Sequence, residues 1–133
     1  MDNITLSYGN KCYCGDEAYL LACGVPQATI DGTNESDRMK AIKAECQCRI
    51  YAEVSAEAQA NISLAAALIG AIAEADRTTE QTAMLAATGE MVDWISSMRA
   101  AVQTLVADSG ADYSLDAAWP ECPATVTALA ADY

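Results

Sequence analysis

The chain has 133 residues, with 19 acidic and 7 basic side chains and a net charge of -12. This length favours one domain, residues 1–133, that is large enough to form a core without a metal or disulfides. The negative charge argues against DNA and RNA as partners, because Lys and Arg contacts to phosphates dominate nucleic-acid affinity.

The first 33 residues are predicted to form a small β-hairpin and a short helix. Apolar and polar side chains alternate over Ile4–Tyr8, and Gly9-Asn10 then supplies a two-residue turn before a second strand. Asp16 can cap a short helix that ends near Gly24. The following segment, 27–33, is expected to be a connector.

Two long helices are predicted over residues 34–108. Asn34 offers an N-cap for the first helix, which is expected to run to Ala75. Ser55 could interrupt this helix, but the helix-favouring residues around it favour a continuous or gently kinked helix. Thr78 begins the second, with a glutamine three residues later that completes a capping box, and this helix is expected to end at about Asp108. Because the turn between the helices is short, they are predicted to form an antiparallel helical hairpin.

The second long helix carries an apolar stripe at helical spacing. Its predicted core or interface residues are Met91, Trp94, Ile95, Met98, Val102 and Leu105. The facing residues on the first helix are expected to be Ile42, Cys46 and Ile50. A separate alanine-rich face with Ala58, Ala65, Ala66 and Ala73 would allow close approach by another helix.

The last segment, residues 109–133, is predicted to be irregular over Asp112–Ala118 and extended at Trp119-Pro120. Pro123 is suited to begin a short final helix, Pro123–Asp132. Trp119 is expected to be largely buried and to wedge this segment against the helical hairpin. The fold class that follows is mainly α, with a small N-terminal β-hairpin and short helix, a long antiparallel helical hairpin and a short C-terminal helix.

Catalytic motifs are missing from the sequence. Histidine does not occur, which removes the usual general base and the commonest metal ligand, and no glycine-rich phosphate loop is present. We therefore expect a protein that is not an enzyme and that uses no cofactor.

The six cysteines allow three interpretations: metal ligands, disulfides or reduced thiols. Cys12 and Cys14 would lie on one face of a strand and, with Cys23, are the candidate metal ligands. Cys46 and Cys48 are about 200° apart on a helix, so they cannot form a matching pair. Disulfides are the second reading, and reduced, buried thiols are favoured over both.

The N-terminus lacks the basic start and apolar centre of a signal peptide, and the longest apolar run, Ile62–Ala73, is too short to span a bilayer. These features predict a soluble protein that is made in the cytoplasm and has no membrane partner.

Four local patterns within residues 40–133 resemble small proteins and C-terminal segments from the tail-fibre region of tailed bacteriophages. They are Arg49-Ile50, Gln59-Ala60-Asn61, Trp94 with Met98-Arg99, and Trp119-Pro120 with Pro123, Val126 and Leu129. Such segments often carry two arginines where this chain has Cys48-Arg49. The resemblance does not extend to the cysteine-containing N-terminal residues.

The resemblance implies a tail or tail-fibre component, or a fibre assembly chaperone, that works by protein contact in the virion after assembly in the host cytoplasm. The expected partners are other virion proteins or further copies of the chain, bound through apolar helix faces or the edges of the N-terminal hairpin. A generic helical interaction module and a small cysteine-based metal or redox protein are the alternatives.

Overall fold

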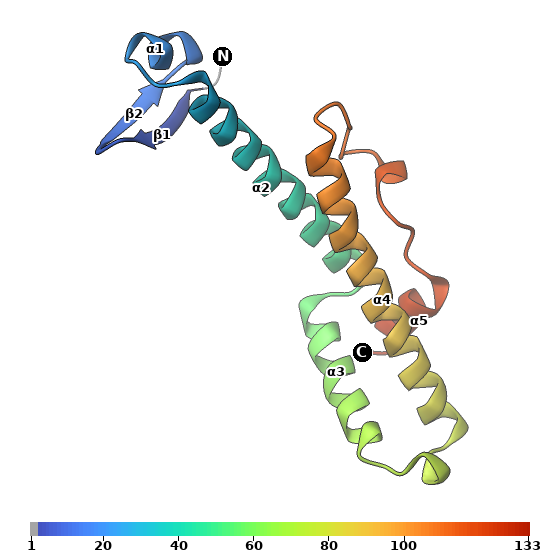
Figure 1. Ribbon diagram of the computed structural model, residues 1–133. Coiled ribbons are helices and arrows are strands. Elements are labelled where there is room, and N and C mark those ends of the chain that lie inside the picture. The colour runs from blue at the N-terminus through green and yellow to red at the C-terminus, as the bar shows by residue number, and fades with distance from the viewer. Residues whose placement is uncertain (1–2) are drawn as a thin grey trace. The chain divides into compact units, whose positions relative to one another are not determined.

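The computed structural model describes residues 3–133, with the side chains of 34–36 left out of the description. The protein is mainly helical, with 69% of residues in helices, a two-stranded antiparallel sheet near the N-terminus and a helix near the C-terminus (Figure 1). The chain divides into two compact units, residues 1–42 and 43–133. No helix of the described residues is both long and apolar enough to cross a membrane.

The first unit contains the predicted hairpin and short helix. Strands β1 (Ile4–Tyr8) and β2 (Lys11–Gly15) pair antiparallel, and Gly9 takes the positive φ of 61° that their two-residue turn requires. Helix α1 (Glu17–Ala22) begins at Asp16, whose carboxylate accepts a hydrogen bond from the Tyr19 backbone N–H at 2.8 Å. These predictions are confirmed.

Helix α2 (Gln27–Glu53) begins seven residues earlier than the sequence predicts. The prediction of a connector over 27–33 is wrong, because Pro26 opens the helix: its carbonyl accepts hydrogen bonds from the backbone N–H groups of Thr29 and Ile30. Ile30 is fully buried in a core with Leu6, Leu20 and Val25, which compensates for Gly32 inside the helix. Asn34, the predicted N-cap, lies within α2, and its side chain is outside the described residues.

The long first helix is interrupted at Ser55, so the prediction of a continuous or gently kinked helix to Ala75 is wrong. Helix α3 (Ala56–Gly70) begins after Ser55, whose hydroxyl accepts a hydrogen bond from the Ala58 N–H at 3.0 Å. The Gln59 side chain donates to the Val54 carbonyl at 2.9 Å, so the interruption leaves this carbonyl bonded. A short 3₁₀ turn, η1 (Glu74–Asp76), follows α3.

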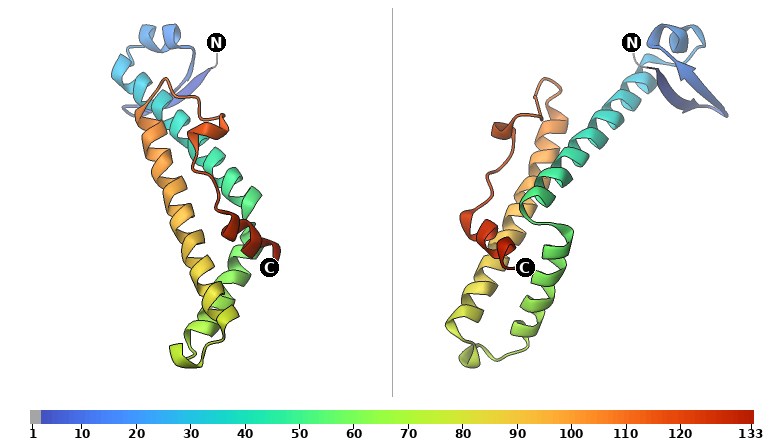
Figure 2. Two further views of the ribbon diagram at one scale, coloured as in Figure 1. Left: turned by 90° about the vertical axis from the view of Figure 1, so that its right-hand side faces the viewer. Right: turned by 180° about the vertical axis from the view of Figure 1, so that it is seen from behind.

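Helix α4 (Thr79–Ala107) forms the centre of the second unit. Its predicted capping box is confirmed: Thr78 accepts from the Gln81 N–H at 3.1 Å, and the Gln81 side chain accepts from the Thr78 N–H at 2.9 Å. After α4 come a 3₁₀ turn, η2 (Asp116–Ala118), and helix α5 (Ala124–Ala131). Both α3 and α5 pack against α4 (Figure 2).

Candidate interaction surfaces

The predicted stripe of α4 supplies much of the core of the second unit. Its buried members are Met91, Trp94, Met98, Val102 and Leu105, and Cys46 and Ile50 of α2 are buried as well. Ile95 is only half-buried, so of its two predicted roles, core or interface, the structure leaves the interface. Ile95 lies at the edge of a groove, where it remains available to a partner.

Trp119 is buried, with 7% of its surface exposed, as predicted, and its indole N–H donates to the Tyr113 carbonyl at 2.8 Å. Arg49 holds the same segment to α2, a role that sequence reasoning missed. Its guanidinium donates to the Asp116 carboxylate and to the Ser114 carbonyl, each at 2.9 Å, and lies 5.7 Å from the centre of the Trp119 ring. The segment between Tyr113 and Trp119 is therefore fixed on the second unit.

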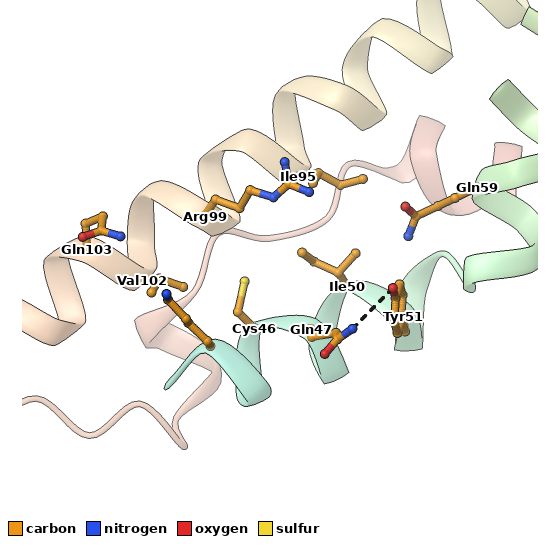
Figure 3. Close-up of a pocket in the computed structure, with 10 residues that line it drawn as sticks. Cys46, Gln47, Ile50, Tyr51, Gln59, Ile95, Arg99, Val102 and Gln103 are labelled. Carbon is orange, nitrogen blue, oxygen red and sulfur yellow. Dashed lines mark hydrogen bonds between the residues drawn. The ribbon is translucent and has the colours of Figure 1, made fainter. Parts of the chain in front are cut away.

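A groove with a volume of about 460 Å³ lies between α2 and α4, and we call it the basic groove. It is lined by Lys43, Cys46, Gln47, Ile50, Tyr51, Gln59, Ile95, Arg99, Val102 and Gln103. Figure 3 shows Cys46 and Ile50 opposite Ile95 and Arg99, with Gln59 of α3 beyond them. Apolar side chains thus form the floor, and longer polar side chains surround it.

The charge of the basic groove is opposite to that of the whole chain. Lys43 and Arg99 both line it, and none of its ten described lining residues carries a carboxylate. Both side chains are exposed, and within the described part of the chain neither forms a salt bridge. Burial raises the pKa of the Cys46 thiol on the groove floor, and the positive charge of Arg99 partly opposes this shift. The groove therefore offers an apolar floor and two uncommitted positive charges.

A second cavity of about 590 Å³ lies beside Trp119 and suits a ligand less well. Its lining includes the acidic residues Glu53, Asp116 and Glu121, and its arginine, Arg49, is already bonded to Glu45 and Asp116. Burial raises the pKa of the Cys122 thiol in this lining, which makes the thiolate scarce at neutral pH. This arrangement supports the packing of the tail and offers no evident chemistry.

The outer side of α3 presents an apolar surface, which we call the α3 face. It consists of Ala60, Asn61, Leu64, Ala67, Leu68 and Ala71, all of them exposed. Leu64 and Leu68 are one helical turn apart and are 63% and 65% exposed. No charged residue occurs from Ala58 to Ala73. The alanine-rich face expected from sequence lies largely on the other side, since Ala58 is buried in its own chain.

The six cysteines are free thiols, and the expectation that they are buried is wrong for four of them. Cys12, Cys14, Cys23 and Cys48 are exposed, Cys122 is partly buried and Cys46 is buried. Cys12 and Cys14 share one face of β2, where they accept hydrogen bonds from Ser7 and Thr5 of β1. Within the described residues, no three cysteine, aspartate or glutamate side chains gather in an arrangement that could hold a metal ion.

The chain matches no protein-family model. A comparison with curated proteins likewise gives no match. The surfaces described above and the local resemblance in the sequence are therefore the basis for a proposed function.

Proposed function

We propose that the protein is a non-enzymatic structural or assembly component of a tailed bacteriophage, associated with the tail or tail fibre and acting through protein contacts. The observation that carries the proposal is the α3 face. Two neighbouring leucines are nearly two-thirds exposed there, and the surrounding residues are small or uncharged. Contiguous apolar surface of this kind is typical of a protein–protein interface.

The surrounding residues favour a helix or sheet of a larger protein as the partner of this face. The alanines of this face, Ala60, Ala67 and Ala71, allow close backbone approach, so the leucines can fill grooves on the partner. Because the α3 face has no charged side chain, no charge on this face has to be taken out of water when a partner covers it. The phage resemblance supports a virion protein as this partner.

The predicted long helical hairpin is proposed here with a shorter first helix, α3. Helices α3 and α4 are joined by a short connection, contact one another and lie side by side in Figures 1 and 2. We propose that this pair is the hairpin that presents the α3 face. A fibre assembly chaperone would use the same face during assembly, and it differs only in leaving before the particle is complete.

The test compares the wild-type chain with the double variant Leu64→Ser and Leu68→Ser in binding to purified tail and tail-fibre proteins. As the two large apolar side chains at the centre of the proposed interface, the leucines together should contribute about 2 kcal/mol or more, so we expect roughly a 30-fold or greater loss of affinity. Leu21→Ser, which changes an exposed leucine on α1, is the matched control. Equal binding by both variants and wild type would remove the α3 face from the proposal.

A further inference from the structure

We infer that the basic groove binds the Asp112–Asp116 segment of a second copy of this chain, with Leu115 on the apolar floor. This inference rests on the proposed function only in taking protein contact as the activity, and it uses surfaces other than the α3 face. It concerns two parts of residues 43–133, which form one compact unit.

The groove selects an acidic segment with an apolar side chain. Ile50, Ile95 and Val102 supply the apolar surface, while Lys43 and Arg99 add two positive charges with no carboxylate in the lining. An incoming segment that lacked negative charge would leave both cations without partners, and one that lacked an apolar side chain would leave the floor uncovered. The occupant must therefore combine the two properties.

The segment from Asp112 to Asp116 has both properties. Leu115 is 56% exposed, and the two flanking aspartates are exposed as well. Asp116 uses one carboxylate oxygen to accept from Arg49, and its side chain remains fully exposed, so it can accept further hydrogen bonds. The chain contains no basic residue beyond Arg99, so nothing in this segment would repel the cations of the groove.

The segment is also held in place before it binds. Arg49 contacts Asp116 and the Ser114 carbonyl, and the Trp119 indole bonds to the Tyr113 carbonyl. Asp112 accepts hydrogen bonds from the Ser114 hydroxyl and backbone N–H, and these bonds lower the pKa of its carboxyl. A preorganised segment loses little conformational entropy on docking, which favours association.

A second copy is favoured over other acidic proteins because the chain itself carries a preorganised acidic segment with an exposed leucine, as the groove requires. In a chain with a net charge of -12, most contacts between copies would bring carboxylates together. At the basic groove, Lys43 and Arg99 would instead attract the aspartates of an incoming segment. The donor segment and the acceptor groove are different surfaces, so one variant can lose the first while another loses the second.

The experiment measures molar mass by light scattering and sedimentation over a range of concentrations. The full chain is kept under a thiol reductant so that exposed cysteines do not cross-link the copies. Wild-type mass should rise with concentration. Leu115→Ser should lose the donor segment, and the double variant Lys43→Glu and Arg99→Glu should lose the acceptor groove. Each should reduce the association constant at least tenfold.

Two controls match these changes. Leu21→Ser removes another exposed leucine, and the pair Lys11→Glu and Lys40→Glu shifts the net charge by the same -4 at exposed lysines outside the groove. Both controls should associate like wild type. An equimolar mixture of the donor and acceptor variants should form a dimer, because each supplies the surface that the other lacks; this result also shows that both are folded.

A wild-type chain that stays monomeric at every concentration would overturn the inference. So would donor or acceptor variants that associate like wild type, or a mixture of the two that remains monomeric. These outcomes are distinct from those of the α3 face, because Leu64 and Leu68 are unchanged in all the variants used here. Retained binding to tail proteins without self-association would reject the groove and leave the proposed function intact.

Discussion

Cys46 is a chemical reporter of the basic groove. Burial raises its pKa, so less of the thiol is ionised near neutral pH, whereas Cys48 on the same helix is exposed. We predict that an alkylating reagent at pH 8 modifies Cys46 more slowly than Cys48, and that the Cys46 rate rises as the pH increases. Arg99→Ala should slow Cys46 further, because removing the nearby positive charge raises the thiol pKa.

Time-resolved mass spectrometry of the alkylated peptides measures both rates in one sample. Equal rates at Cys46 and Cys48 would show that the groove floor is open to solvent and would contradict the packing described here.

Met98 tests whether α4 is held by its own chain. The side chain is 1% exposed and lies among the buried residues of α4. We predict that Met98→Ala lowers the free energy of unfolding by roughly 2–5 kcal/mol, because it leaves a cavity in the core. Val92→Ala, at an exposed position on the same helix, should change it by less than about 0.5 kcal/mol. Chemical denaturation measures both, and a Met98 loss below about 1 kcal/mol would refute the core assignment.

At the scale of elements, Arg49 attaches the irregular tail to α2. It makes two hydrogen bonds to the tail and lies over Trp119, whereas the Asp116 carboxylate that it contacts is exposed. We predict that Arg49→Ala lowers the free energy of unfolding by about 1–3 kcal/mol, since a charged hydrogen bond and ring packing are lost together. Asp116→Asn should have a much smaller effect, because exposed ion pairs contribute little.

Denaturation curves of the two variants, with Trp119 fluorescence in a Trp94→Tyr background, provide the comparison. If Asp116→Asn destabilised the chain as much as Arg49→Ala, the exposed ion pair would be the main link, and the contacts of Arg49 with the Ser114 carbonyl and the Trp119 ring would contribute little.

Gly89 is a weak point inside α4 that can be repaired. An added Cβ would meet no atom within 4 Å, and the backbone there is helical. We therefore predict that Gly89→Ala stabilises the protein by roughly 0.5–1 kcal/mol. Gly9→Ala should do the opposite, because the hairpin turn needs the positive φ of Gly9. Thermal unfolding distinguishes the two, and a loss of stability in Gly89→Ala would show that the glycine is required for a contact.

The elements that sequence predicts well are those with local chemical markers. The two-residue turn at Gly9-Asn10, the Asp16 cap and the Thr78 capping box each act over a few residues, and all are present. The errors occur where tertiary packing decides. A proline such as Pro26 is compatible with the end of one helix or the start of the next, and the burial of Ile30 favours a helix that starts there. Ser55 reads as a helix interior or a cap, and the structure uses it as a cap.

The candidate surfaces were less accessible from sequence. Periodicity identifies the buried stripe of α4, but it cannot show which face of the alanine-rich α3 turns outward. The basic groove joins Lys43 and Arg99 across 56 sequence positions, so spacing gives no sign of it. The bonds of Arg49 to Ser114 and Asp116 are likewise long-range.

In the molecule as a whole, two surfaces lack the negative charge by which this acidic chain repels other acidic proteins. The α3 face is uncharged, and the basic groove is positive. We propose that the first binds a larger virion protein and that the second binds another copy of the same chain. On this proposal the chain is an adaptor that acts through protein contact.

The most direct test of this account is the amount of the chain in purified phage particles and in their tail assembly intermediates, measured by quantitative mass spectrometry. We predict a fixed ratio to a tail or tail-fibre protein in at least one of these fractions, and a loss of that association in the variant with Leu64→Ser and Leu68→Ser. A chain absent from the particles and from every assembly intermediate would contradict the central claim.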